Sequence, residues 1–185
     1  MMKVQKDKKK KKVIIAEGRF VRFVKRGHWE YFERNNCGGM VIILAMTKEK
    51  EVLFVEQYRP PVDKKVIEFP AGLVQDKEHK ESFIQGARRE LLEETGFYAK
   101  KIKKLFYGPA SSGMTSDMLT VMMAFDLRKV HEGGGDETES IKVHKIPFFK
   151  VEAWLDVMRK KGRLVSPRIY AGLYLLAKYN EVNRK

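Results

Sequence analysis

The chain has 185 residues, of which 43% are hydrophobic, and carries a formal net charge of +14 at pH 7. This length and composition are typical of one folded domain with a hydrophobic core, and they exclude a mainly disordered chain. The longest apolar run, residues 40–46, is too short to cross a bilayer, and no signal-peptide core is present. The single cysteine, Cys37, excludes an internal disulfide and suits a reducing compartment, so we expect a cytoplasmic protein without a membrane segment.

Much of the positive charge lies at the N-terminus. Seven lysines and one aspartate fall within residues 1–12 and contribute +6, which leaves +8 on the rest of the chain. A lysine-only run without aromatic residues is typical of a solvated tail, which we predict for residues 1–12. The remaining basic surface would attract a nucleotide or RNA, so a nucleic-acid partner is possible but not favoured.

Strand patterns dominate the chain, with helical patterns near the middle and the end. Three short antiparallel strands are expected within residues 13–36, joined in part by a hairpin turn at Arg26 and Gly27. Helices are expected after Ser82, over residues 151–160, and from Ser166 and Pro167 to Glu181. Further strands are expected at residues 40–46, 52–58, 98–107, 118–127 and 141–146.

The helix after Ser82 has clear ends. Ser82 can cap its N-terminus while Gln85 reaches back to it, and Gly96 stands where a left-handed C-terminal cap belongs. An apolar stripe at three- and four-residue spacing should lie on a sheet; its members are Ile84, Ala87 and Leu91.

Three glutamates gather on another face of this helix. Glu90 and Glu94 are four residues apart, and Glu93 lies beside them. A solvated acidic face balanced by neighbouring arginines is the usual explanation of such a run. The alternative is a site for a hard cation such as Mg²⁺, because a predicted tight turn at residues 69–72 could add a carbonyl oxygen to the carboxylates, and hard cations prefer oxygen ligands.

The whole stretch resembles the Nudix box, G-x5-E-x7-R-E-U-x-E-E-x-G-U, in which U is a bulky aliphatic residue. The matching residues are Gly72, Glu81, Arg89, Glu90, Leu91, Glu93, Glu94, Gly96 and Phe97. Eight residues separate Gly72 from Glu81 where the box has five, whereas the seven-residue gap from Glu81 to Arg89 is kept. Glu78 would restore the first gap and break the second. Glu81 is preferred because the preceding polar loop tolerates an insertion and the helix does not.

This resemblance implies an α/β fold of the Nudix type, with a mixed β-sheet sandwiched between helices over residues 37–185. The strand unit of residues 13–36 would be attached to it. The resemblance also implies that Glu90, Glu94 and the Ala71 carbonyl hold Mg²⁺ or Mn²⁺. Glu93 would be a further ligand or an orienting group, and Arg89 would belong to the catalytic box.

Two further segments, EQYRPP at residues 56–61 and VIEFPAG at 66–72, resemble the ADP-ribose and nucleoside diphosphate sugar pyrophosphatases of that superfamily. The implied reaction cleaves the pyrophosphate linkage to a nucleoside monophosphate and a sugar phosphate. Arg59, held stiffly before two prolines, could clamp a phosphate with two hydrogen bonds. The alternative role of Arg59 is a surface ion pair. Glu68 could be the partner in that pair, whereas the resemblance places it near the metal and the substrate.

The same branch uses aromatic residues of an N-terminal strand unit to stack on the nucleobase. Trp29 and Phe20 are the candidates here, and the resemblance implies a homodimer in which these strands reach the partner subunit. Residues 109–117 form a loop of small residues whose backbone amides suit a phosphate or ribose. In it, Ser112, Gly113 and Met114 align with substrate-contacting positions of the branch.

An acidic loop follows the glycines at residues 133–135. By its spacing alone it is a solvated loop, but the resemblance places a catalytic glutamate in such a Glu-x-Glu segment. Glu137 or Glu139 is therefore the candidate general base, and the sequence does not decide between them.

Two other functions remain open. The basic surface is compatible with a Nudix hydrolase of capped RNA or dinucleoside polyphosphates, and also with a non-catalytic nucleic-acid-binding protein on this scaffold. Against the latter, every carboxylate needed for metal binding is present, and we identify no obvious RNA-binding pattern of interleaved basic and aromatic residues.

Overall fold

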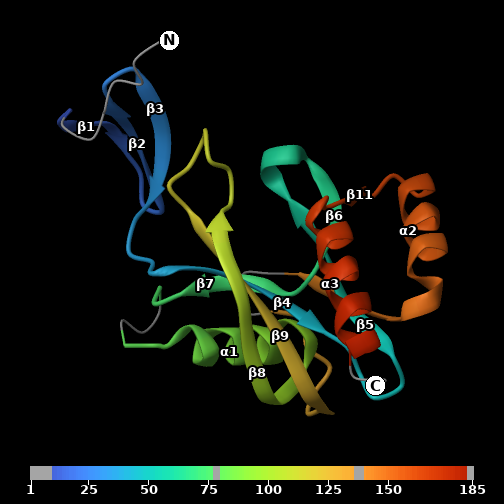
Figure 1. Cartoon of the computed structure of the whole chain (residues 1–185). Helices are drawn as coiled ribbons and strands as arrows, with labels where there is room; N and C mark the ends of the chain where they lie inside the picture. The colour runs from blue at the N-terminus through green and yellow to red at the C-terminus, as the bar shows by residue number, and fades with distance from the viewer. Residues whose placement is uncertain (1–9, 77–79, 136–139, 183–185) are drawn as a thin grey trace, which may run out of the picture.

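The computed structural model describes residues 10–76, 80–135 and 140–182. It consists mainly of strands, with one helix near the middle of the chain and two near its end, as the sequence predicts (Figure 1). The predicted tail lies almost wholly outside the described residues, and Lys12 already belongs to the first strand. The strands are β1 (Lys12–Glu17), β2 (Val21–Arg26), β3 (Trp29–Arg34), β4 (Gly39–Ala45), β5 (Glu51–Arg59), β6 (Lys64–Glu68), β7 (Ala71–Val74), β8 (Phe97–Pro109), β9 (Met118–Lys129), β10 (Ile141–Pro147) and β11 (Leu164–Val165). The helices are α1 (Phe83–Thr95), α2 (Val151–Lys160) and α3 (Arg168–Val182), with short 3-10 turns at Pro60–Val62 and Phe148–Lys150.

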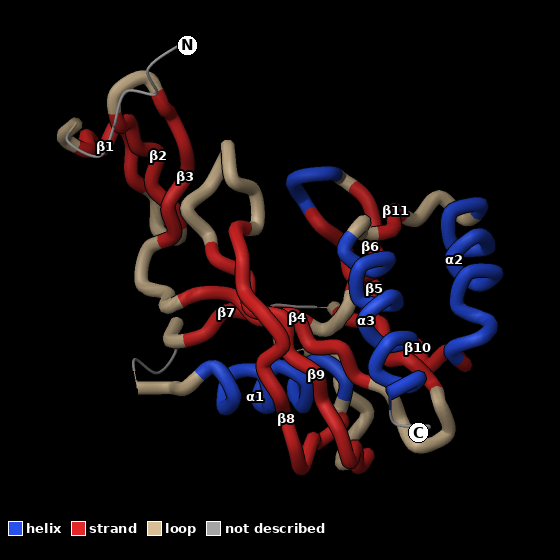
Figure 2. Tube along the Cα trace, viewed as in Figure 1, coloured by secondary structure: helices blue, strands red, loops and turns tan. Residues whose placement is uncertain are grey.

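The main body contains two four-stranded sheets, in the orders β7-β4-β9-β8 and β10-β5-β6-β11. The pairs β4–β9 and β6–β11 are parallel and the others are antiparallel. Helix α1 lies against the first sheet, while α2 and α3 lie on the other side of the body (Figures 1 and 2). The predicted α/β architecture, a mixed sheet arrangement between helices, is confirmed. None of the described helices is long and apolar enough to cross a membrane.

The core has two parts, one on each side of the central strands. Between α1 and the first sheet, Leu91 and Ile43 are fully buried. On the other side, Phe54, Leu155 and Ile169 are fully buried where the sheets meet α2 and α3. Burial of each such side chain contributes about 1.5–3 kcal/mol to folding, so these clusters fix the frame on which the acidic helix lies.

Both predicted ends of α1 are confirmed. Ser82 and Gln85 form a reciprocal capping box, and Gly96 adopts the left-handed conformation with φ 72°. The predicted apolar stripe is wrong at one position, because Ile84 is 43% exposed. At this end of the helix Phe83 packs against the core instead, beside Gly86, which has no Cβ and lets Val74 approach.

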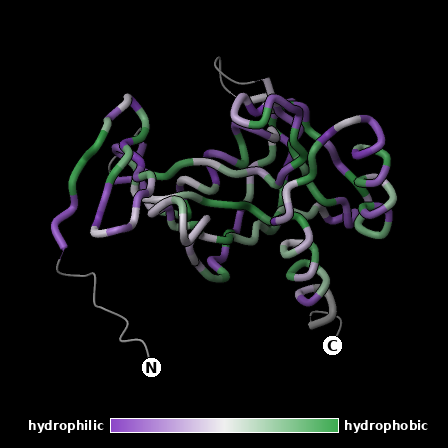
Figure 3. Tube along the Cα trace, turned by 90° about the horizontal axis from the view of Figure 1, so that it is seen from above, coloured by the Kyte–Doolittle hydropathy of each residue, from purple (hydrophilic) through white to green (hydrophobic). Residues whose placement is uncertain are grey.

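The N-terminal strands form a separate antiparallel sheet, β1-β2-β3, as predicted (Figures 1 and 3). Figure 3 shows this unit beside the body, with hydrophobic stretches of its own. It is joined to the loop before β9 by hydrogen bonds from Phe32 N to Met114 O at 2.9 Å and from Ser116 N to Phe32 O at 3.0 Å. An ion pair between Arg34 and Asp117 at 3.1 Å adds to this contact, so β3 and the loop of small residues lie side by side.

Candidate active site

The two carboxylates predicted to bind metal lie against the start of β7. Glu94 is 2% exposed, and its Oε2 accepts a hydrogen bond from the Ala71 backbone N–H at 3.0 Å. Glu90 occupies the space that a side chain at residue 72 would fill, since a methyl group on Gly72 would lie 2.0 Å from the Glu90 carboxyl carbon. The predicted turn is shorter than expected: Ala71 and Gly72 already pair with β4, because the bend is completed at Phe69 and Pro70.

Arg89 lies among the other glutamates of this stretch. Its Nε and Nη2 donate to both carboxylate oxygens of Glu81, at 2.8 and 3.1 Å, and Nη1 donates to Glu90 at 2.8 Å and to Glu93 at 3.2 Å. Nη2 also donates to the Leu73 carbonyl. The hydrogen bonds to Glu81 are the main reason that the pKa of Arg89 is raised above its usual value. The geometry is that of a positioning residue, which fixes the Glu90 carboxylate and the loop before α1.

Glu81 is 7% exposed and accepts hydrogen bonds from Arg89 at both of its carboxylate oxygens. This contact supports the preference for Glu81 as the first glutamate of the motif. Glu78 lies outside the described residues.

The pKa of Glu90 is raised to about 7, mainly by burial and also by the charges of Glu93 and Asp76, against the lowering effect of Arg89. A nearby cation favours the ionised form of such a carboxyl group. The carboxylates and the adjacent backbone carbonyl are hard oxygen donors, so these residues fit a divalent cation in kind. Within the described part of the chain, no three acidic, histidine or cysteine side chains already form a metal-binding group, since Glu90 and Glu93 are turned to Arg89.

A cleft beside these carboxylates is lined by three arginines from different elements. Arg34 comes from the end of β3, Arg59 from the end of β5, and Arg168 from the start of α3. Ala71 and Gly72 line the same cleft, so it reaches the strand that Glu90 and Glu94 contact. This arrangement can bind a phosphorylated group next to the carboxylates of Glu90 and Glu94.

Arg59 and Glu68 both line the cleft and are paired with each other, with Nε 2.8 Å from Oε2. The ion pair that the sequence offered as the alternative to phosphate binding by Arg59 is therefore present. Because both residues line the cleft, Arg59 still lies where a phosphate could bind. Arg34 and Arg168 were missed from the sequence. For Arg168 the one signal was its place after Ser166 and Pro167, which indicated only a helix start.

The NUDIX domain family matches residues 37–171. The chain belongs to this family. It is 35% identical to the ADP-ribose pyrophosphatase of Bacillus subtilis (strain 168) over 141 residues. This alignment covers 76% of this chain and 73% of that protein. It is 33% identical to the GDP-mannose pyrophosphatase of Escherichia coli (strain K12) over 127 residues. This alignment covers 64% of this chain and 63% of that protein.

A crystal structure of an ADP compounds hydrolase has the same fold, with a TM-score of 0.69, 19% identity, and coverage of 94% of this chain and 93% of that chain. The predicted Nudix family is thus confirmed, and with it the prediction of a Nudix pyrophosphohydrolase. In this Nudix enzyme, α1 with its caps at Ser82 and Gly96 forms the helix of the Nudix box.

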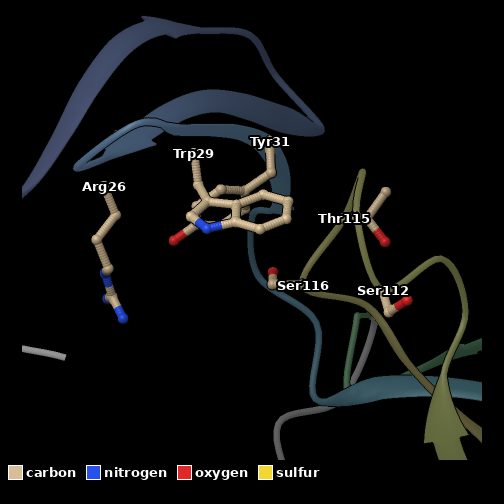
Figure 4. A pocket seen from close by; sticks show the side chains of 7 residues that line it. Arg26, Trp29, Tyr31, Ser112, Thr115 and Ser116 are labelled. Atoms are coloured by element: carbon tan, nitrogen blue, oxygen red, sulfur yellow. The ribbon is translucent and has the colours of Figure 1, made fainter. Parts of the chain in front are cut away.

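A second pocket, of about 280 Å³, lies between the N-terminal sheet and the loop before β9 (Figure 4). Trp29 points from β3 toward the segment that carries Ser112 and Thr115, and Arg26, Tyr31, Gly113 and Ser116 complete the lining. The structure therefore brings together three of the predicted substrate residues: Trp29, Ser112 and Gly113.

Two other predicted substrate residues, Phe20 and Met114, do not line this pocket. Phe20 is 68% exposed and lines a different hollow with Arg19 and Arg34. Met114 is 58% exposed and is not among the residues that line either hollow; its carbonyl instead ties the loop to Phe32. Glu137 and Glu139, the candidate general bases, lie outside the described residues.

The contact between Gly72 and Glu90 gives a first test. Gly72→Ala should displace the Glu90 carboxylate and lower kcat by roughly tenfold or more, because a misplacement of about 1 Å is costly in a catalytic site. The displaced group is the end of a flexible side chain, so the melting temperature should change little. Gly108→Ala is the matched control, since nothing lies within 4 Å of a methyl group there. An unchanged kcat in Gly72→Ala would mean that catalysis does not depend on the observed position of the Glu90 carboxylate.

Proposed function

We propose that this Nudix enzyme hydrolyses the pyrophosphate linkage of nucleoside diphosphate sugars, of the ADP-ribose and GDP-mannose type, to a nucleoside monophosphate and a sugar phosphate. The observation that carries the proposal is the position of Glu90 and Glu94 against β7, whose first residues line a cleft with three arginines. The relatives named ADP-ribose pyrophosphatase and GDP-mannose pyrophosphatase support this substrate class.

In this proposal Glu90, Glu94 and the Ala71 carbonyl hold Mg²⁺ or Mn²⁺, with Glu93 as a further ligand or orienting group. A bound divalent cation supplies charge neutralisation at the phosphates and lowers the pKa of the attacking water. Arg89 keeps Glu90 in place through its contacts with Glu81 and Leu73.

The remaining proposed roles concern the substrate. Arg59 steadies the phosphates during in-line displacement, and its pairing with Glu68 at 2.8 Å holds it in the cleft wall. Glu137 or Glu139 takes the proton from the attacking water. Trp29 stacks on the nucleobase, with Ser112 and Gly113 beside it, and Phe20 and Met114 remain weaker candidates.

We also propose a cytoplasmic homodimer in which the strand unit of residues 13–36 contacts the second subunit, attached to a Nudix domain of residues 37–185. Val13, Ile14 and Ile15 on β1 are each about half exposed, and β1 is an edge strand of its sheet. Exposed apolar edge strands are suited to pairing with another chain.

Trp29 gives a test of the base-stacking proposal. It is 50% exposed, so Trp29→Ala should leave the fold intact. Loss of one stacking contact of about 1–3 kcal/mol should raise KM for purine substrates roughly tenfold, with a smaller change in kcat. Phe149→Ala is the control, because Phe149 is 82% exposed and lies outside the pocket. Equal KM values in the two variants would remove Trp29 from the base site.

The bond that is cleaved tests the proposed reaction itself. With ADP-ribose and Mg²⁺, we expect AMP and ribose 5-phosphate as the only products by chromatography, in equal amounts. Release of ADP and free ribose would mean that the linkage between the β-phosphate and the sugar is cleaved, and would contradict hydrolysis of the pyrophosphate bridge.

A further inference from the structure

An arginine from outside the Nudix box reaches the cleft through the start of α3. Strand β11 runs parallel to β6, with Leu164 opposite Val66 and Val165 opposite Ile67. The next residue, Ser166, donates its backbone N–H to the Ile67 carbonyl at 3.0 Å. This pairing places Ser166 and Arg168 beside the chain that runs on through Phe69 into Ala71, and all four line the cleft.

Two contacts anchor this segment on either side of Arg168. Before it, Arg163 Nε lies 3.2 Å from Glu56 Oε1, and the other oxygen of Glu56 is 2.9 Å from His144 Nε2. After it, a methyl group on Gly172 would lie 2.2 Å from a ring carbon of Phe69, so α3 packs closely on that ring. Since Ile169 is also fully buried, the backbone that carries Arg168 is fixed on the cleft wall.

The three arginines of the cleft differ in how their charge is balanced. Arg34 is paired with Asp117 at 3.1 Å, and Arg59 is paired with Glu68 at 2.8 Å. Arg168 is exposed and has no carboxylate within ion-pair distance among the described side chains of residues 10–76, 80–135 and 140–179. Its charge is therefore the one guanidinium charge of the described cleft that no neighbouring acid offsets.

We propose that Arg168 is a substrate-binding residue, which holds the negatively charged diphosphate of the substrate and sets its affinity rather than the rate of the chemical step. This inference rests on the proposed function. A guanidinium presents donors in a planar fork that fits phosphate oxygens, and an unpaired one does not have to break an ion pair before it binds.

The test compares wild type, Arg168→Gln, Arg168→Lys and the control Arg128→Gln in ADP-ribose hydrolysis with Mg²⁺. Arg128 lies exposed on β9, so its substitution removes the same charge at a place outside the cleft. Because a charge-assisted hydrogen bond to phosphate is stronger than a neutral one, Arg168→Gln should raise KM about tenfold or more while kcat stays within about threefold. Arg168→Lys should recover part of the loss, and the defect should shrink as salt screens the interaction.

Equilibrium binding of ADP-ribose, measured by calorimetry with EDTA present, separates this inference from the proposed function. Wild type that binds but does not turn over ADP-ribose would contradict the proposed reaction, while a weaker affinity in Arg168→Gln would still support the role of Arg168. An unchanged KM and an unchanged Kd in Arg168→Gln would contradict that role alone. Wild type that neither binds nor cleaves the compound would contradict both.

Discussion

Glu94→Gln should lower kcat by roughly a hundredfold or more while the protein stays folded, because a ligand carboxylate loses its charge. The side chain is 2% exposed, and its Oε2 accepts the Ala71 N–H at 3.0 Å. A glutamine of the same shape can still accept that hydrogen bond through its carbonyl oxygen, so the local structure should persist. Initial rates on ADP-ribose at saturating Mg²⁺, together with the melting temperature, measure the two parts of this expectation.

Glu152→Gln is the matched control for this substitution. Glu152 lies exposed in the first turn of α2 and outside the cleft, so the same chemical change there should leave kcat within about twofold, as for most surface substitutions. Near-normal turnover of Glu94→Gln at saturating metal would remove Glu94 from the metal site. A large fall in melting temperature would instead show that its charge is needed for the fold.

Arg89→Met should be the most destabilising single change in this region, with a loss of about 3–5 kcal/mol in the free energy of unfolding. Arg89 donates to both oxygens of Glu81, which is 7% exposed, and to Glu90. Removing the guanidinium takes this cation from the buried Glu81 carboxylate and from the half-buried Glu90 carboxylate, which is costlier than losing the pair as a whole. Urea unfolding followed by circular dichroism gives the free energy directly.

The double variant Arg89→Met with Glu81→Gln separates buried charge from lost packing. If the cost arises because the Glu81 carboxylate loses the charge of Arg89, the double variant should be more stable than Arg89→Met alone by about 1 kcal/mol or more. Arg128→Met, exposed on β9, should cost less than about 0.5 kcal/mol. A small effect of Arg89→Met, close to that control, would mean that the guanidinium network contributes little to folding.

The acidic helix was predictable because its signals are local. Its capping box, the glycine at its end and the spacing of Glu90 and Glu94 all lie within one stretch of sequence, and the structure has each of these local features. The error at Ile84 arose because the neighbouring Phe83, four residues before Ala87, fits the apolar side of the helix equally well and lies over Gly39 of β4. Phe83 packs against the core instead of Ile84.

The walls of the cleft were harder to predict, since they depend on contacts between distant segments. Arg34, Arg59 and Arg168 come from three parts of the chain and meet only through the pairing of β11 with β6 and of the N-terminal sheet with its loop. The same reason explains why Trp29 and Phe20, which are close in sequence and shared one predicted role, lie in different hollows. For Arg59 and Glu68, by contrast, the sequence already suggested a possible ion pair, and the structure shows it between the neighbouring strands β5 and β6.

The most direct test of the proposed reaction is a panel of ADP-ribose, ADP-glucose, GDP-mannose, UDP-glucose and capped RNA, assayed for phosphatase-sensitive product with Mg²⁺ and with EDTA. We expect strong hydrolysis of one or more of the nucleotide sugars, which EDTA abolishes. Hydrolysis of capped RNA above that of every nucleotide sugar, or no hydrolysis of any sugar with Mg²⁺, would contradict the proposed function.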